Sequence, residues 1–482
     1  MRISELLGIK KSRKELDFYD YEVDNDTYAF LDPYYISKSN DPVIKECNEY
    51  VESFFDQFLT LLKLDINRAY EIFSHLGEVN EICLGMSRGL PTGKGMGEED
   101  RKRVFDAIVN SDAYKNGLTD RLEDLRLFVK GIDKDKISDM VANLIKYPLI
   151  KYTQNQCDLF EIELEDVESG YYWDKNDWAY SYERMIVRNG RKYLLFPKSI
   201  ITFSKEYYTK QYLRKYALEK LKEVNLEKDT HLVRKKFDKK GVLIRKYVLK
   251  KDVEEEILAE EGTPTIQKQW LSKFTKEYPD SLKKFKKETI DKILVYNDPI
   301  SSDEENEIID ALISGFNDIE TGATKASTYQ KYVAGILELL FYPQIRHPRL
   351  EAEINEGRKR IDIIYDNTAE TGFFFLLGNS YRITCPIIIV ECKNYQDDIK
   401  NPEIDQLAGR FSANRGYFGI ICCRSIENEA LFIKREQDLA KDKHEYIIHL
   451  TDDDFKELLS IKKENGDLDD FLSKKFSQIC GA

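Results

Sequence analysis

The feature that most constrains the fold is a short apolar run, residues 386–390, which ends abruptly in Glu391, Cys392 and Lys393. An apolar run of this length is typical of a strand that is buried on both faces of a sheet. Because side chains alternate along a strand, Glu391 and Lys393 are expected on one face and Cys392 on the other. The sequence thus predicts a buried strand with an acid and a lysine side by side at its end.

A second apolar segment, residues 359–365, contains one acid, Asp362. If the two strands pair, Asp362 and Glu391 meet at the edge of the sheet with Lys393 beside them. Two carboxylates are suitable ligands for a hard divalent cation, and the lysine can hold or activate a water molecule. These are the groups that metal-assisted hydrolysis of a phosphodiester requires.

The length and charge of the chain limit the remaining possibilities. Its 482 residues suggest two to four domains. The hydrophobic content of 42% allows a large core and argues against global disorder. The net charge is -13, so any phosphate-binding surface must be a local basic patch.

Cysteine usage and hydropathy predict a cytoplasmic protein. None of the eight cysteines forms a Cys-x-x-Cys pair, and several lie in apolar runs. This pattern predicts buried thiols in a reducing compartment and neither a disulfide framework nor a zinc site. The N-terminus has no signal-type apolar core and no run of 18 apolar residues occurs, so no membrane association is expected.

The chain divides into three predicted regions. Residues 1–165 have mainly helical apolar spacing, residues 166–300 form a basic, aromatic-rich α+β region, and residues 301–482 form an α/β domain. A glycine-rich segment at 87–97 contains Lys94 but lacks the Walker pattern, so a flexible loop is favoured and a phosphate-contacting loop is the alternative.

The middle region is locally basic. Between Lys205 and Lys251 there are sixteen Lys and Arg residues and six Asp and Glu residues, interleaved with tyrosines. Such a tract is typical of nucleic-acid binding. The alternative is a solvated helix face and a charged hairpin around residues 238–241, with the tyrosines packed inward.

After residue 300 the pattern alternates between helices and strands and predicts a mixed sheet covered on both faces. The run at 372–377 is expected to be a buried strand, with a dimer surface as the alternative. Asn401 is expected to cap a helix at 402–413, with Gln406 and Arg410 on one face. The other predicted helices lie at 303–315, 328–341, 427–441 and 452–460, and the other predicted strands at 359–365, 386–393, 417–423 and 445–450.

The order of these elements, Asp362, the Glu391-Cys392-Lys393 triplet and Gln406 together resemble the PD-(D/E)XK nuclease superfamily, and within it the Mrr-type restriction endonucleases. The resemblance covers roughly residues 320–425. It implies a restriction-endonuclease-like αβββαβ core and a phosphodiesterase that uses Mg²⁺, or Mn²⁺, on DNA more often than RNA. It also implies a homodimer.

The resemblance assigns roles to individual residues. Asp362, Glu391 and the backbone carbonyl of Cys392 would bind the metal, Lys393 would activate the water or steady the developing charge, and Gln406 would orient the lysine or the water.

The family also places an acid, or sometimes a glutamine, in the helix before the Asp362 strand. At about 100° per residue, Glu338 points away from the apolar stripe of that helix, whereas Gln330 flanks it. Gln330 is therefore the predicted partner, and a glutamine there leaves a second metal open.

Nearby, residues 358–360 (Arg-Lys-Arg) are expected either to grip backbone phosphates or to form a solvated entry to the strand.

The leading hypothesis is a metal-dependent endonuclease with an N-terminal recognition or sensor region, in restriction or anti-phage defence, with a phage-derived or nucleotide trigger left open. One alternative is a nucleic-acid-binding platform without turnover. The other is a nuclease for repair or for RNA.

Overall fold

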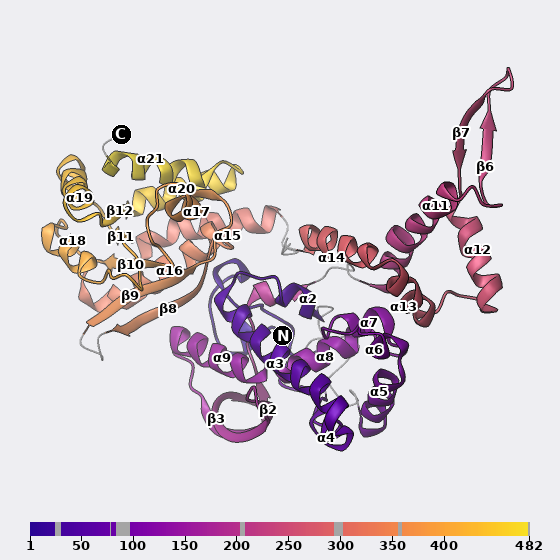
Figure 1. Ribbon diagram of the computed structural model, residues 1–482. Helices are drawn as coiled ribbons and strands as arrows, with labels where there is room; N and C mark the ends of the chain where they lie inside the picture. Colours follow the sequence, from indigo (N-terminus) through magenta and orange to yellow (C-terminus); the bar gives the residue numbers. More distant parts are fainter. Residues whose placement is uncertain are drawn as a thin grey trace.

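The computed structural model describes residues 1–24, 30–77, 79–82, 97–202, 208–293, 302–354 and 359–480. Three parts follow one another along the chain: an N-terminal domain, a projecting helical arm and a C-terminal α/β domain (Figure 1). In the described residues, no helix is both long and apolar enough to cross a bilayer. Most of the glycine-rich segment, including Lys94, and the boundary near residue 300 lie outside the described residues, so those predictions stay untested.

The N-terminal domain is mainly helical, with a small antiparallel sheet in the order β2-β3-β4. Its core joins buried residues from Ile3 to Ile201 and therefore crosses the predicted boundary at residue 165. Trp173 shows the reason: its ring packs edge-on against Phe54 at 5.1 Å, and its indole donates to Ser53 Oγ. The aromatic residues at the start of the predicted middle region therefore belong to the N-terminal domain.

The elements of the N-terminal domain are α1 (Ile3–Leu6), β1 (Phe30–Leu31), α2 (Pro33–Ile36), α3 (Pro42–Leu64), α4 (Ile66–Ser74), α5 (Glu98–Asn110), α6 (Asp112–Lys115), α7 (Asp124–Phe128), α8 (Lys134–Leu144), α9 (Lys146–Phe160), β2 (Glu165–Trp173), β3 (Trp178–Arg188), β4 (Arg191–Tyr193) and β5 (Ile201–Thr202).

The arm extends away from this domain and ends in a hairpin, as Figure 1 shows. Tyr212 and Tyr216 are buried at its base, whereas Tyr208 is exposed, so the prediction of inward-packed tyrosines holds for part of the tract. The arm consists of α10 (Thr209–Tyr212), a π-helical turn (Leu213–Ala217), α11 (Leu218–Glu227), β6 (Arg234–Phe237), β7 (Leu243–Tyr247), α12 (Lys250–Glu261), α13 (Lys268–Glu277) and α14 (Pro279–Ile293).

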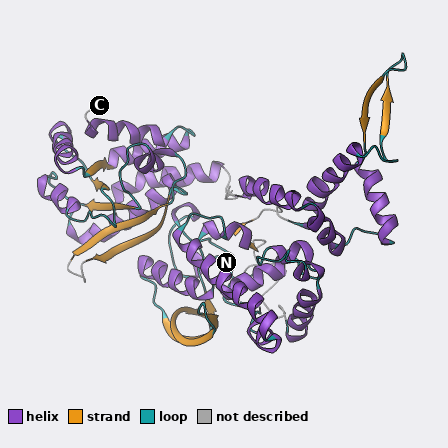
Figure 2. Ribbon diagram, in the orientation of Figure 1, coloured by secondary structure: helices purple, strands orange, loops and turns teal. Residues whose placement is uncertain are grey.

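The C-terminal domain contains a five-stranded mixed sheet in the order β12-β11-β10-β9-β8. Strand β9 pairs antiparallel with both β8 and β10, whereas β10, β11 and β12 run parallel to one another. Helices cover both faces of the sheet (Figure 2). Each face has its own apolar core, so the predicted α/β class with a mixed, doubly covered sheet is confirmed.

The strands of this domain are β8 (Ile345–Ile354), β9 (Lys359–Asn367), β10 (Ile387–Lys393), β11 (Phe418–Cys423) and β12 (Tyr446–Thr451). The helices are α15 (Ser302–Gly315), α16 (Ala326–Phe341), α17 (Gly372–Asn379), α18 (Asn401–Ala408), α19 (Glu429–Lys443), α20 (Asp452–Lys463) and α21 (Leu468–Cys480).

The prediction of a strand at residues 372–377 is wrong, because this segment forms helix α17. A six-residue apolar run has no periodicity that separates a buried strand from a buried helix. Here Phe373, Phe374 and Leu377 are buried and Phe375 is partly exposed, which is helical spacing.

Strand β8, which pairs with β9 at one end of the sheet, was not predicted. Its sequence is polar and contains Pro348, because it is an edge strand with a register shift between Arg346 and Arg349.

Two details of the next helix also differ from prediction. Asn401 is the first residue of α18 rather than its cap, and Lys400 occupies the cap position. Arg410 lies beyond the end of the helix at Ala408, so it does not share a helical face with Gln406.

The described cysteines form no disulfide. Five are buried as predicted, Cys392 is partly buried, and Cys480 is exposed. No group of three or more His, Cys, Asp or Glu residues in the described part of the chain has a metal-binding arrangement.

Candidate functional site

The two predicted acids come together where β9 and β10 stop pairing. The antiparallel register ends at Val390 and Ile363, so the next opposed pair would be Glu391 and Asp362. There the Asp362 carboxylate takes the place of a backbone partner, and its Oδ2 accepts a hydrogen bond from the Cys392 amide at 2.8 Å. The end of the ladder thus fixes both acids at one edge of the buried sheet.

Glu391, Lys393 and Gln406 form a closed hydrogen-bonded triangle. Lys393 Nζ donates to Glu391 Oε1 at 2.8 Å and to Gln406 Oε1 at 3.0 Å. Gln406 Nε2, from α18, donates to the same Glu391 oxygen at 2.7 Å. The strand alternation places Glu391 and Lys393 together on the side of α18, while Cys392 packs into the core on the opposite face. The lysine is therefore held by two partners at the position the sequence predicts.

The second oxygen of Glu391 has no such partner. Glu391 is 1% exposed, and within the described part of the chain no hydrogen-bond donor reaches its Oε2. A buried carboxylate oxygen without a donor is costly unless a cation or water meets it. Glu391 and Asp362 are therefore the residues of this site that could hold a divalent cation.

The charges of the site agree with this fit. Burial and the nearby negative charge of Glu391 together raise the pKa of Asp362 to about 6. Two acids that repel one another gain stability when a cation binds between them. Burial alone would lower the pKa of Lys393, but the charge and hydrogen bond of Glu391, together with Tyr395 and Asp362, raise the net pKa above its usual value. Lys393 is therefore held in its charged form.

Gln330 lies under Asp362, as the helical phase predicts. From α16, its Nε2 donates to the backbone carbonyl of Asp362 at 2.5 Å and contacts Glu351 Oε1 at 3.3 Å. Glu351, on β8, contributes to the raised pKa of Asp362. Sequence reasoning missed Glu351 because β8 itself was not predicted. Alternation of charged and apolar residues at 349–354 is the signal that could have found it.

Asn394 and Arg424 hold the end of β10 in place, and the sequence analysis did not identify either residue. The Asn394 side chain donates to the carbonyls of Glu320 and Gly322, and Arg424 donates to Asn394 Oδ1 and Asp452. These bonds tie the end of β10 to the segment that leads into α16. Of the predicted basic group at 358–360, Arg358 lies outside the described residues and Arg360 is exposed on β9.

Glu338, the alternative partner in α16, lies away from the site. It is 1% exposed and pairs with Lys198 of the N-terminal domain at 3.4 Å. Burial raises its pKa to about 7. Glu338 therefore belongs to the junction between the two domains.

The centre of that junction is His347 on β8. Its ring lies between two N-terminal carboxylates, with Nδ1 at 3.0 Å from Asp17 and Nε2 at 2.7 Å from Asp41. Arg346 also pairs with Asp41, at 2.9 Å. Burial alone would lower the pKa of His347, but the charges of both aspartates raise it well above its usual value. A charged histidine thus bonds the N-terminal domain to the strand that bears Glu351.

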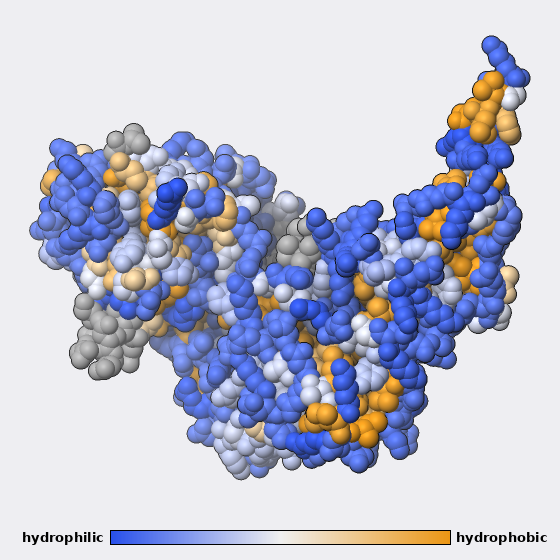
Figure 3. Space-filling model, viewed as in Figure 1, coloured by the Kyte–Doolittle hydropathy of each residue, from blue (hydrophilic) through white to orange (hydrophobic). Residues whose placement is uncertain are grey.

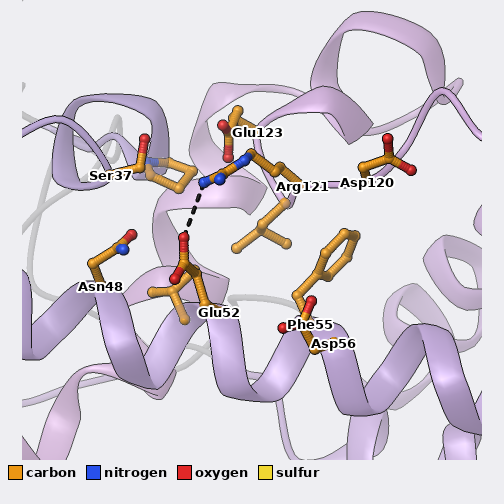
Figure 4. Close-up of a pocket in the computed structure, with 11 residues that line it drawn as sticks. Ser37, Asn48, Glu52, Phe55, Asp56, Asp120, Arg121 and Glu123 are labelled. Carbon is orange, nitrogen blue, oxygen red and sulfur yellow. Dashed lines mark hydrogen bonds and ion pairs between the residues drawn. The ribbon is translucent and has the colours of Figure 1, made fainter.

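A separate pocket of about 200 Å³ lies in the N-terminal domain, between α3 and the segment before α7 (Figure 4). Four acids line it, Glu52, Asp56, Asp120 and Glu123, with one cation, Arg121, which pairs with Glu52 at 3.0 Å. Burial raises the pKa of Glu123 to about 7. This excess of carboxylates disfavours phosphate groups, so the pocket offers no support for a nucleotide trigger.

Fold and site together define a mixed α/β domain with a paired-carboxylate and lysine site at the end of adjacent strands, joined to a separate N-terminal domain. Residues 8–209 match a family model described as a domain of unknown function, DUF8370. This match covers the N-terminal domain and ends just beyond β5. No curated protein and no solved structure matches the chain.

Proposed function

We propose that the C-terminal domain is a divalent-metal-dependent endonuclease of the PD-(D/E)XK superfamily, which hydrolyses phosphodiester bonds of nucleic acid. The observation behind this proposal is a buried Glu391 oxygen that has no hydrogen-bond donor and lies in the same site as Asp362. Next to it is a lysine that is bonded to both Glu391 and Gln406.

The residues suggest how the reaction is divided. Asp362, Glu391 and the Cys392 carbonyl would hold Mg²⁺ or Mn²⁺, which when bound supplies Lewis-acid stabilisation of the phosphate charge. Lys393 would orient the attacking water and neutralise negative charge that develops on the phosphoryl oxygens as one P–O bond forms and another breaks. Gln406 keeps the lysine in place.

The biological setting is part of the same proposal and rests on the family resemblance alone. It is restriction or anti-phage defence in the cytoplasm, with the N-terminal domain as the recognition or sensor part and a homodimer as the acting form.

The test is a cleavage assay of the full chain with supercoiled DNA, linear DNA and RNA, in Mg²⁺, Mn²⁺ or EDTA. Lys393→Ala and Asp362→Asn should each lower the rate by about 10²-fold or more, because each removes a group that stabilises the transition state. Lys434→Ala, an exposed lysine on α19, is the matched control and should cleave normally.

Metal-dependent cleavage that survives both substitutions would rule out this site. Salt-sensitive binding without cleavage in any metal would favour the platform without turnover. Cleavage of RNA alone would favour the RNA-directed alternative.

A further inference from the structure

The hairpin at the end of the arm is exposed along its whole length. Strands β6 and β7 contact one another but no third strand, and every residue from 234 to 246 is exposed. We call residues 234–247 the ribbon. Two-stranded hairpins of this size are marginally stable by themselves. A binding partner that covers the ribbon would stabilise it.

The ribbon concentrates positive charge in an acidic protein. It has seven Lys and Arg residues and one acid, Asp238, whose carboxylate accepts two backbone amides of the turn. Like charges stand directly opposite one another: Lys235 faces Lys246, and Lys236 faces Arg245. Opposed like charges destabilise a hairpin. An anionic partner would remove this repulsion.

Most of these cations have no carboxylate partner within the described residues. Arg234 pairs with Asp252 and Lys246 with Asp229, both near the base. No ion pair is found there for the others, which are Lys235, Lys236, Lys239, Lys240 and Arg245. Cations that point into solvent without a partner are free to contact phosphates.

Apolar side chains lie among the cations. Phe237, Val242, Leu243 and Ile244 are between 44% and 62% exposed. Figure 3 shows them as an apolar patch on the hairpin, bordered by hydrophilic residues. Exposed apolar groups that are rimmed by charge are typical of a contact surface.

The base of the ribbon is firmly held. Val248 follows β7 and packs with Leu218, Val253 and Ile257 between α11 and α12. Further down, Lys268 Nζ donates to three backbone carbonyls at the end of α7 and beyond it, those of Arg126, Val129 and Ile132. The arm thus holds the ribbon away from the N-terminal domain.

We propose that the ribbon binds duplex DNA by lying in the major groove, with its cations on the phosphates and its apolar side chains against the base edges. A two-stranded β-ribbon fits the major groove of B-form DNA, which is about 12 Å wide, and apolar side chains contact the thymine methyl group there. The major groove of duplex RNA is too narrow and deep to admit side chains. The ribbon therefore selects DNA over RNA. This inference deepens the proposed function, on which its meaning for substrate choice rests, although binding can be measured without cleavage.

The test measures binding of the full chain to a fluorescent 24-base-pair DNA duplex by anisotropy, in EDTA and over a range of KCl concentrations. The triple variant Lys235→Gln, Lys236→Gln, Arg245→Gln should bind at least about tenfold more weakly. The slope of log affinity against log salt should fall by roughly two to three, since each lost phosphate contact removes about 0.9. The matched control removes three exposed lysines of the N-terminal domain (Lys45→Gln, Lys63→Gln, Lys102→Gln) and should bind as the unchanged protein does.

A second pair of variants separates charge from base contact. Phe237→Ser with Ile244→Ser should weaken binding while the salt slope stays the same. Lys235→Arg with Lys236→Arg should keep both affinity and slope. Far-UV circular dichroism should be unchanged in all variants, because the altered side chains are exposed.

An unchanged salt slope in the triple variant would overturn the proposal. So would equal affinity for an RNA duplex of the same sequence, or tighter binding to vesicles of 70% phosphatidylcholine and 30% phosphatidylserine. The Lys393→Ala variant should bind DNA normally. If it does while the unchanged protein cleaves nothing, the ribbon proposal stands and the nuclease proposal fails.

Discussion

At the scale of single residues, the candidate site depends on groups whose positions follow directly from local spacing. Glu391 and Lys393 are two apart on one strand, and Gln406 follows in the next helix, so alternation and chain order were sufficient to place them together. Glu351 was missed because it reaches Asp362 from β8, an edge strand whose only local signal is the short alternation at 349–354. Local periodicity thus located the centre of the site but not its edge.

The glutamine at position 330 gives a residue-scale prediction. Gln330 donates to the Asp362 carbonyl next to Glu351, so a carboxylate there would lose the donor and add a third negative charge. Gln330→Glu should therefore lower the free energy of unfolding by about 1–3 kcal/mol and by more than Gln330→Ala does. Urea unfolding at pH 7 measures both variants. Higher stability or faster cleavage in Gln330→Glu would show that position 330 is instead an acidic metal ligand.

At the scale of elements, the buried strands β10, β11 and β12 and the helices around them were predictable, because burial on two faces leaves continuous apolar runs. The errors occurred where one pattern fits two structures. The run 372–377 is as apolar as a strand, but it lies against α21, and Asp469 accepts a hydrogen bond from the Phe373 amide at its start. Tertiary contacts, which the local sequence does not contain, decide such cases.

Helix α17 can be tested by two neighbouring phenylalanines. In a strand Phe373, Phe375 and Leu377 would share a face, whereas in the helix Phe374 is fully buried and Phe375 is 38% exposed. Phe374→Ala should lower the free energy of unfolding by about 3–5 kcal/mol, and Phe375→Ala by about 0.5 kcal/mol or less. Urea denaturation of the two variants gives the comparison. The reverse order of effects would favour the strand.

At the scale of the whole molecule, the N-terminal domain and the α/β domain are joined through buried charges rather than apolar surface alone. His347 lies between Asp17 and Asp41, and Arg346, Lys198, Glu338 and Tyr152 are close by. Removing one partner of a buried ion pair leaves an uncompensated charge, at a cost of about 3–5 kcal/mol. Local sequence patterns could not predict this junction, since its members are far apart along the chain.

The junction predicts how stability changes with pH. The raised pKa of His347 means that its contribution is complete below about pH 6.5 and is lost as pH rises through the folded-state value. Glu338, with its pKa raised to about 7, acts in the same direction. Asp17 and Asp41 have lowered pKa values, so their contributions are lost only as pH falls below about 4. Because the contribution of Glu338 is lost between about pH 4.5 and 7 and that of His347 at higher pH, the melting temperature should fall steadily from pH 5 toward pH 9.

Scanning calorimetry between pH 5 and 9 checks this prediction. His347→Gln should melt at lower temperature at pH 6 and show a smaller fall toward pH 9, because the titrating group is gone. His231→Gln is the control, since His231 forms an exposed pair with Glu256. Melting curves of His347→Gln that run parallel to those of the unchanged protein at every pH would contradict the assignment.

The position of β8 at the end of the sheet has one more consequence. An edge strand offers unpaired backbone groups to other chains and is a common starting point for aggregation. Helix α9 of the N-terminal domain packs on this strand, so the domain shields an edge that would otherwise be open. An isolated C-terminal domain would expose β8 and is expected to self-associate. The N-terminal domain, proposed above as a sensor, would then also prevent aggregation through this strand.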